Sequence, residues 1–247
     1  MHESEYFNIA RCEPIHWWYA GMRAAAAGWL RRLPASVGTP PLLLDAGCGT
    51  GGGLRWLAEF GRTCGADLHP LALRLAARDG RTPLLQADIR TLPFADRSFS
   101  AITSFEALCQ LPRGEDVVAL REFVRVLHPG GWLLLRLPAH EWLRGPHDDF
   151  VHTRHRYSRG EVQAKLRGVG LQPMRTSYAN AALFLPVALR RLLQRWAARP
   201  AASDLRMPSR FLNFLLSAWL RGEAAWLRRF NFPFGLSVLV LARKTPA

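Results

Sequence analysis

The feature that most constrains this chain is an apolar run that ends in a turn crowded with glycine. Three leucines at residues 42–44 are followed by Asp45 and then by the letters A-G-C-G-T-G-G-G. An uninterrupted apolar run is typical of a parallel strand that is covered on both faces. Clustered glycines allow a sharp turn and let a ligand approach the backbone closely. With a helix expected to open at residues 54–58, the segment predicts a nucleotide-cofactor site.

Asp45, which precedes the glycines, indicates which class of cofactor the site would bind. Gly47, Gly49 and Gly52 fit the G-x-G-x-x-G template, which several cofactors share. Asp45 would repel a pyrophosphate at the strand tip and attract a cationic group. The segment D-A-G-C-G-T-G-G resembles motif I of the class I S-adenosylmethionine-dependent methyltransferases, whose cofactor carries an amino group and a sulfonium but no phosphate. An NAD-dependent oxidoreductase is the alternative that rests on the glycine template alone.

The resemblance continues downstream in the order that this family has. Asp67 ends an expected second strand, 22 residues after Asp45, near the offset of about 20 at which a carboxylate meets ribose hydroxyls. Residues 82–89 resemble the third strand and the adenine-flanking acid. By this resemblance the cofactor should contact Asp45, Gly47, Cys48, Gly49, Thr50, Gly51, Asp67, Leu68, Asp88, Ile89 and Phe105.

Two departures from the family pattern lie in the fourth-strand region. Ser100 stands where an aspartate is usual, and Gln110 stands where relatives commonly place a histidine. The second departure argues against a general base at that position. A Pro-Gly-Gly turn at 129–131 then leads into a fifth strand, so the resemblance covers residues 42–137.

The resemblance implies an α/β fold with a doubly wound, mostly parallel seven-stranded sheet, Rossmann-like in type, and a helical cap insertion before the last strand. We expect an N-terminal helical lid at 1–40, a methyltransferase core at 41–179 and 233–247, and the insertion at 180–232. Strands at 171–178 and 235–243 should pair antiparallel at the sheet edge. A chain of 247 residues with 49% apolar content can bury such a core.

An aromatic cluster at residues 13–23 precedes the first strand and contains Trp17 and Trp18. It should open a helix that runs to about Leu33. Relatives with a similar Glu-x-x-His-aromatic-aromatic segment use this helix to cover the cofactor. Alternatively, the two tryptophans are the apolar face of an ordinary packing helix.

The loop at 138–158 follows the fifth strand, at the edge where ligands sit in doubly wound sheets. It resembles the W-x-x-x-x-H-D-x-x-x-H-x-R-R-Y segment of bacterial methyltransferases linked to glycan, lipid or secondary-metabolite pathways, with His155 in place of the first arginine. His147, His152 and Tyr157 are the candidate catalytic residues, which would deprotonate or position a hydroxyl, with Asp148 as a further candidate. These histidines and the acids at 148 and 149 could bind a metal, but methyl transfer does not require one and none is expected. Alternatively, these polar residues only tie down the loop.

The insertion contains two helical stretches, 181–199 and 210–230, which are rich in Leu, Phe and Trp. Neither has 18 uncharged apolar residues, so neither should span a membrane. Three roles stay open for them: a cap over an apolar substrate, peripheral membrane contact, or a dimer face. The oligomeric state is undetermined.

The net charge of +14 raises the question of nucleic acid. Among the 33 basic residues only Lys165 and Lys244 are lysines, and the arginines are scattered rather than gathered in one segment. Nucleic acid is therefore not favoured, and an anionic membrane or a phosphorylated substrate fits the charge at least as well.

The N-terminus lacks a basic stretch followed by an apolar one, and the four cysteines are far apart. Both features predict a cytoplasmic protein with free thiols, which could contact the inner membrane face peripherally.

These observations predict an S-adenosylmethionine-dependent methyltransferase that methylates an oxygen of a small-molecule or lipid-like acceptor. Two alternatives remain. Ser100 and Gln110 are also compatible with a non-catalytic S-adenosylmethionine-binding regulatory protein of the same fold, and an RNA or protein methyltransferase would share the cofactor site.

Overall fold

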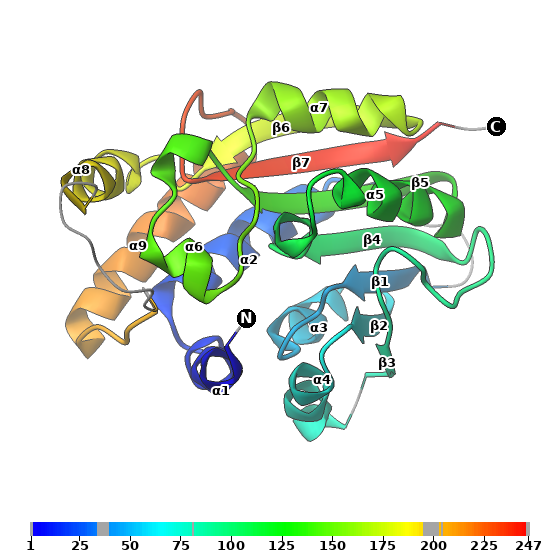
Figure 1. Cartoon of the computed structure of the whole chain (residues 1–247), viewed down its shortest axis with the longest axis horizontal. Helices are drawn as coiled ribbons and strands as arrows, with labels where there is room; N and C mark the ends of the chain where they lie inside the picture. The colour runs from blue at the N-terminus through cyan, green and yellow to red at the C-terminus, as the bar shows by residue number, and fades with distance from the viewer. Residues whose placement is uncertain (1, 34–39, 81, 195–202, 204, 246–247) are drawn as a thin grey trace.

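The computed structural model describes residues 2–33, 40–80, 82–194, 203 and 205–245. Seven strands form one sheet (Figure 1): β1 (Leu42–Ala46), β2 (Arg62–Asp67), β3 (Leu84–Gln86), β4 (Phe99–Phe105), β5 (Leu127–Pro138), β6 (Leu171–Ala179) and β7 (Ser237–Lys244). Their order in the sheet is β3-β2-β1-β4-β5-β7-β6. Strands β1 to β5 pair in parallel, whereas β7 is antiparallel to β5 and to β6. The mostly parallel sheet with an antiparallel last strand is therefore confirmed.

The helices are α1 (Glu3–Cys12), α2 (Trp17–Leu30), α3 (Gly52–Leu57), α4 (Pro70–Ala76), α5 (Glu115–Val126), α6 (Pro146–Phe150), α7 (Arg159–Gly168), α8 (Phe184–Gln194) and α9 (Arg210–Leu227). Helices α5 and α7 cover one face of the sheet, and α2, α3 and α9 cover the other (Figure 1). The helical insertion before the last strand is confirmed in α8 and α9. No helix in the described ranges is long and apolar enough to cross a membrane.

The leucine run of β1 is buried on both sides of the sheet. Leu44 packs into the core beneath α5 and α7, and its neighbour Leu43 packs into the core beneath α2 and α9. Successive side chains of a strand point to opposite faces, so an apolar residue is needed at both positions. This double burial fixes the carboxyl end of β1, where the glycine turn begins.

Helix α9 is anchored against α2, behind the N-terminal segment. The indole Nε1 of Trp29 donates to the carbonyl of Leu227 at 2.9 Å. A Cβ on Gly21 would stand 2.5 Å from Cβ of Leu220, so the two helices approach closely at this glycine. The buried carboxylate of Glu223 accepts from the backbone N–H of Ala182 at 3.3 Å, which joins α9 to the end of β6.

The segment before α9 and the first turn of α9 are hydrogen-bonded to α1 and to the junction between α1 and α2. Asn8 Nδ2 donates to the carbonyl of Leu205 at 3.1 Å, and His16 Nε2 donates to that of Arg206 at 3.2 Å. Asn213 Oδ1 accepts from the backbone N–H of Trp17 at 3.0 Å, and its Nδ2 donates to the carbonyl of Ile15 at 2.9 Å. The insertion therefore supports the N-terminal helices from outside.

Candidate active site

The glycine turn after β1 forms the floor of a cavity of about 380 Å³, a volume within the roughly 300–1,000 Å³ typical of ligand pockets. Gly47 has φ +80°, and a Cβ there would stand 2.3 Å from Cβ of Ala107, so only glycine fits. Gly49 has φ +54°, and its Cβ would meet no atom within 4 Å. Since Gly49 lines the cavity, that open space is part of the cavity.

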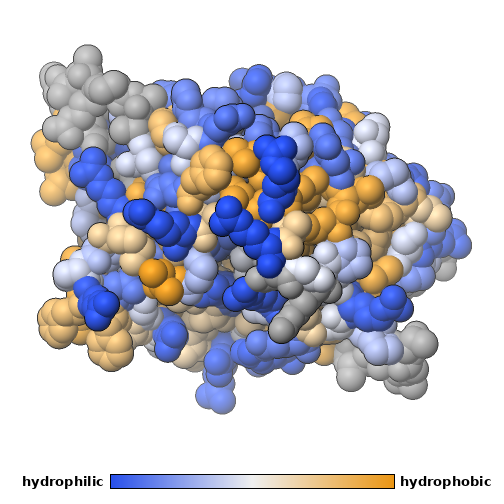
Figure 2. Space-filling view, turned by 90° about the horizontal axis from the view of Figure 1, so that it is seen from below, coloured by the Kyte–Doolittle hydropathy of each residue, from blue (hydrophilic) through white to orange (hydrophobic). Residues whose placement is uncertain are grey.

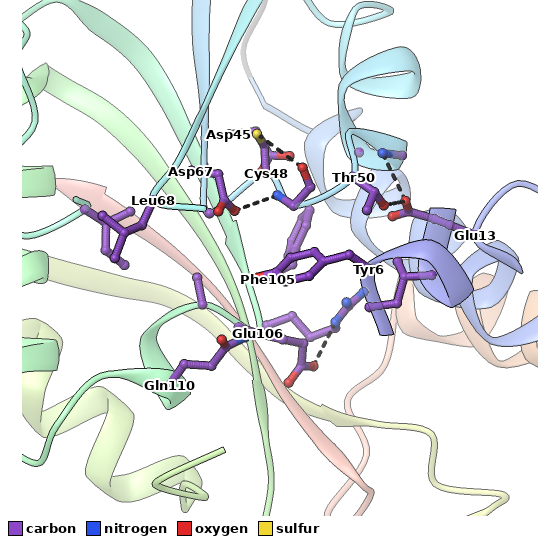
Figure 3. A pocket seen from close by; sticks show the side chains of 18 of the residues that line it. Tyr6, Glu13, Asp45, Cys48, Thr50, Asp67, Leu68, Phe105, Glu106 and Gln110 are labelled. Atoms are coloured by element: carbon purple, nitrogen blue, oxygen red, sulfur yellow. Dashed lines mark hydrogen bonds and ion pairs between the residues drawn. The ribbon is translucent and has the colours of Figure 1, made fainter. Parts of the chain in front are cut away.

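Two carboxylates follow the strands on either side of this turn (Figure 3). Asp67 at the end of β2 accepts from the backbone N–H of Gly49 at 2.8 Å and from that of His69 at 2.9 Å. Asp45 at the end of β1 is buried and accepts from the Thr103 hydroxyl at 2.7 Å. Burial raises the pKa of Asp45 to about 7, although the Thr103 hydrogen bond opposes the shift. A cation bound beside Asp45 would stabilise its ionised form.

The expected adenine end of the cavity contains an acid with a local partner. Arg90 Nε donates to both oxygens of Asp88 at 3.0 Å, and these hydrogen bonds lower the pKa of Asp88. Ile89 and Leu68 line the same region and provide apolar contact. These residues fit the flat, uncharged ring of an adenine better than a phosphate.

The N-terminal helices close the cavity opposite the glycine turn. Glu13, directly after α1, accepts from the Thr50 hydroxyl at 2.7 Å and from the backbone N–H of Gly52 at 3.2 Å (Figure 3). Burial raises the pKa of Glu13, and the same two hydrogen bonds oppose that shift. The Tyr6 ring lines the cavity and stacks on His69 at 4.6 Å. Glu13, the first residue of the Glu-x-x-His-aromatic-aromatic segment, therefore ties the N-terminal helices to the glycine turn.

We expect Glu13→Ala to weaken S-adenosylmethionine binding about tenfold. The variant removes two hydrogen bonds to a carboxylate, each worth roughly 1.5–3 kcal/mol when fully formed, and water replaces part of them. Calorimetric titration would measure the dissociation constant. Glu3→Ala, an exposed acid at the start of the same helix, is the matched control and should leave it unchanged. Equal affinities in the two variants would contradict a role of Glu13 in closing the site.

An ion pair at the end of β4 and β5 forms another wall of the cavity. Arg136 Nε donates to Glu106 at 3.1 Å, and its guanidinium lies 5.1 Å from the centre of the Phe105 ring. Figure 3 shows Phe105 and Glu106 near the centre of the cavity, and Arg136 also lines it. Glu106 has φ +57°, an uncommon conformation for a residue other than glycine. Such strain concentrates at functional sites.

The structure brings together most of the residues that the sequence assigned to the cofactor. The lining includes Asp45, Gly47, Cys48, Gly49, Thr50, Asp67, Leu68, Asp88, Ile89 and Phe105. Gly51 lies outside it, because a Cβ there would stand 2.8 Å from Cβ of Ala76 in α4. Gly51 therefore allows α4 to pack closely on the turn. The sequence pattern does not distinguish a glycine needed for such packing from one needed for ligand contact.

Of the three catalytic candidates, the structure brings only His152 to the cavity. Its backbone φ is +58°, and partial burial together with nearby positive charges, including Arg154, lowers its pKa. His147 lies in α6 and does not line the cavity. Tyr157 is 2% exposed and donates to Asp116 at 3.0 Å, which places it in the core beneath α5.

Asp148 lies inside the loop rather than at a metal or proton-transfer site. It accepts from Arg156 Nε at 2.9 Å and from the backbone N–H of Gly145 at 2.8 Å, which caps α6. In the described part of the chain, no group of three His, Cys, Asp or Glu side chains has a metal-binding arrangement. Asp148 and Arg156 thus tie down the loop, as the structural alternative predicted.

The residues that line the cavity show which helices enclose it. Tyr6, Ile9, Tyr19 and Met22 of α1 and α2 line it, whereas none of the described residues of 180–232 does. The expectation that the insertion encloses the acceptor site is therefore corrected. The insertion packs on α2 and is separated from the cavity by the N-terminal helices.

Comparison with known proteins identifies the architecture. Residues 44–135 match the family described as a methyltransferase domain. Cycloartenol-C-24-methyltransferase 1 of Oryza sativa subsp. japonica is 30% identical over 148 residues, which are 55% of this chain and 39% of that protein. Fatty-acid O-methyltransferase of Mycolicibacterium smegmatis is 36% identical over 98 residues, which are 37% of this chain and 35% of that protein. The chain thus spans less than half the length of these relatives.

A solved structure resembles the described fold along nearly the whole chain. It is the Haloferax volcanii complex between the Trm112 methyltransferase activator and a methyltransferase, with a TM-score of 0.63 and 21% identity over 99% of this chain and 95% of that one. This likeness concerns the fold. The family match covers the strands and the glycine turn that build much of the cavity, so residues 44–135 form a methyltransferase domain.

Proposed function

We propose that the chain transfers a methyl group from S-adenosylmethionine to an oxygen of a small or lipid-like acceptor. The observation that carries this proposal is that His152 lines the same cavity as Gly49, Asp45 and Asp67. One wall thus offers open space and carboxylates for a cationic cofactor, and another offers an imidazole whose lowered pKa keeps it neutral near pH 7.

The cofactor supplies a methyl group that is already electrophilic, so the residues of the chain mainly position the reactants. Asp67 and the Gly49 turn would hold the ribose end, and Asp45 would face the positive charge of the amino-acid end. Positioning of this kind can lower a barrier by about 7–11 kcal/mol. His152 Nε2 or Nδ1 would accept the proton of an acceptor hydroxyl.

Known relatives support the class of acceptor. One similar protein is named for methylation of the sterol cycloartenol at carbon, and another for O-methylation of fatty acids. Both acceptors are lipids, but the reacting atoms differ. We favour oxygen because a histidine lines the cavity. A lipid-like acceptor would be met at a membrane.

The proposal is tested by incubating the protein with S-adenosylmethionine and a panel of acceptors matched in chain length: a fatty alcohol, a fatty acid and a fatty amine. We expect S-adenosylhomocysteine with an oxygen acceptor, and mass spectrometry should locate the methyl group on oxygen. Methylation only of the amine would overturn the choice of atom. Cofactor binding without product from lipids, RNA or protein would favour the non-catalytic regulatory alternative.

A further inference from the structure

The insertion carries an unusual amount of exposed apolar surface. Twelve of the twenty exposed large hydrophobic residues in the described chain lie between Leu185 and Phe230. On α9, Phe211, Phe214 and Trp219 are 73%, 68% and 66% exposed. Together with Leu215 and Trp226 they follow the three- and four-residue spacing of one helix face. We call this outward stripe of α9, with Leu185 and Leu189 of α8, the docking surface.

The docking surface does not face the rest of the protein. The opposite side of α9, with Leu220, Ala224 and Leu227, is the side that packs on α2. Helix α8 and the first half of α9 lie at the left end of the molecule in Figure 1. At the same end of the view from below, hydrophobic and strongly hydrophilic residues alternate on the surface (Figure 2).

The charges around this surface have one sign. Residues 181–230 contain nine arginines, no lysine and two acids. Among the described residues of this stretch, the only acid is Glu223, which is buried and accepts from backbone N–H groups. Arg210 and Arg221 lie beside the stripe in the helical register, and Arg229 follows its end. Exposed aromatic residues bordered by arginine are typical of helices that lie in the interface of an anionic membrane.

A second copy of the chain fits this surface less well. Pairing two such faces would bring two sets of arginines together without acids to neutralise them, and like charges across an interface are unfavourable. The cores of protein interfaces are also depleted in charge, whereas here arginines border the apolar stripe closely. An anionic bilayer provides both an apolar layer and negative charge.

We propose that the docking surface binds an anionic lipid bilayer and thereby brings the lid to the membrane. The link to the lid is direct, because Asn213, at the start of α9, is hydrogen-bonded to the backbone of Ile15 and Trp17 between α1 and α2. Ile15 is itself 60% exposed. An acceptor with a lipid tail would reach the cavity from that side. The docking itself does not depend on the proposed methyl transfer, but this role in acceptor supply does.

Vesicle flotation with the full chain tests the docking. We compare vesicles of phosphatidylcholine alone with vesicles containing one quarter phosphatidylglycerol. The partition coefficient should be at least tenfold higher for the anionic vesicles and should fall in high salt, which screens the arginines. Equal partition into both vesicles, or no partition, would overturn the proposal.

Two double variants separate the apolar and the electrostatic parts. Phe214→Ser with Trp219→Ser should reduce partition into anionic vesicles at least tenfold. Arg210→Gln with Arg229→Gln should remove only the preference for phosphatidylglycerol. The matched controls are Arg113→Gln, just before α5, with Arg121→Gln on α5, and Met174→Ala on β6, which alter exposed residues away from the docking surface. Controls that lose binding as strongly as the test variants would contradict the assignment.

Light scattering distinguishes the membrane from a second copy. A wild-type dimer that becomes a monomer in the Phe214→Ser, Trp219→Ser variant would show a self-interface and overturn the proposal. Unchanged S-adenosylmethionine affinity in that variant would show that it folds. Methyl transfer to a water-soluble acceptor without vesicles tests the proposed function separately, so the two can fail independently.

Discussion

Gly49→Val should abolish S-adenosylmethionine binding, with an affinity loss of at least 100-fold. A Cβ at this position would enter the cavity without touching any protein atom, so the valine methyl groups would take space that the ligand needs. Valine at φ +54° is also strained, which costs roughly 1–3 kcal/mol. Calorimetry measures the binding, and thermal unfolding measures the strain.

The chain offers a matched control for that strain. Gly80 has φ +61°, and its Cβ would likewise meet no atom within 4 Å, but it lies outside the cavity. Gly80→Val should therefore lower the melting temperature about as much as Gly49→Val and leave binding intact. If both variants lost binding, or if Gly49→Val bound normally, the glycine turn would not be the cofactor site.

The elements that the sequence predicted well are those whose signals are local. The leucine run, the glycine turn and Asp67 placed β1 and β2 within a residue of their observed ends. The spacing of apolar residues likewise placed β6 and β7, because burial on one or two faces determines the periodicity of a segment. A helix at 210–230, rich in Leu, Phe and Trp, was also expected and corresponds to α9.

The residues that sequence reasoning missed act through distant contacts. Glu13 meets Thr50 across 37 positions, and the sequence gives no local sign of that contact. A helical lid was expected at 1–40, but the helix located within it opens at 13–23. A separate helix α1 was not placed, since its mixed polar sequence shows its role only in its packing against α4. Phe105 was assigned, but its neighbour Glu106 and the partner Arg136 were not, because their pairing depends on the register of β4 and β5.

Other segments that the sequence assigned to the site lie away from the cavity. Residue type alone does not show how deeply a side chain is buried or which face of a helix is covered. Tyr157 looked like a hydroxyl-positioning group, yet its hydroxyl donates to Asp116, 41 residues away in sequence, and its ring lies beside Lys165, which together hold it in the core. The insertion was apolar enough to cover a substrate, but periodicity cannot tell which face of a helix is covered by protein. The structure shows that α2 takes one face of α9 and leaves the aromatic face outward.

The last prediction with a large expected effect concerns His152, in the loop after β5. His152→Ala should lower kcat about 10²–10⁴-fold for a hydroxyl acceptor, the range that a general base contributes. His152 lines the cavity, so it can meet an acceptor there, whereas His147 does not line it. The cofactor affinity should hardly change, since Asp67 and Gly49 are untouched. Steady-state kinetics and calorimetry together separate these two effects.

The pH profile gives a second and independent readout. Partial burial and neighbouring positive charge lower the pKa of His152, so its free imidazole persists below the usual value of about 6.5. A base works only when it is unprotonated; therefore kcat should be constant near pH 7 and fall once the pH drops below this lowered pKa. His152→Ala should lose that acid limb, and the exposed His128→Ala should keep it. If His147→Ala removed the limb instead, the base would lie in α6 and the loop would have to move on binding its ligands. If the acid limb persisted in both His152→Ala and His147→Ala, the group that titrates would be the acceptor itself. A carboxylate acceptor needs no base once it is ionised.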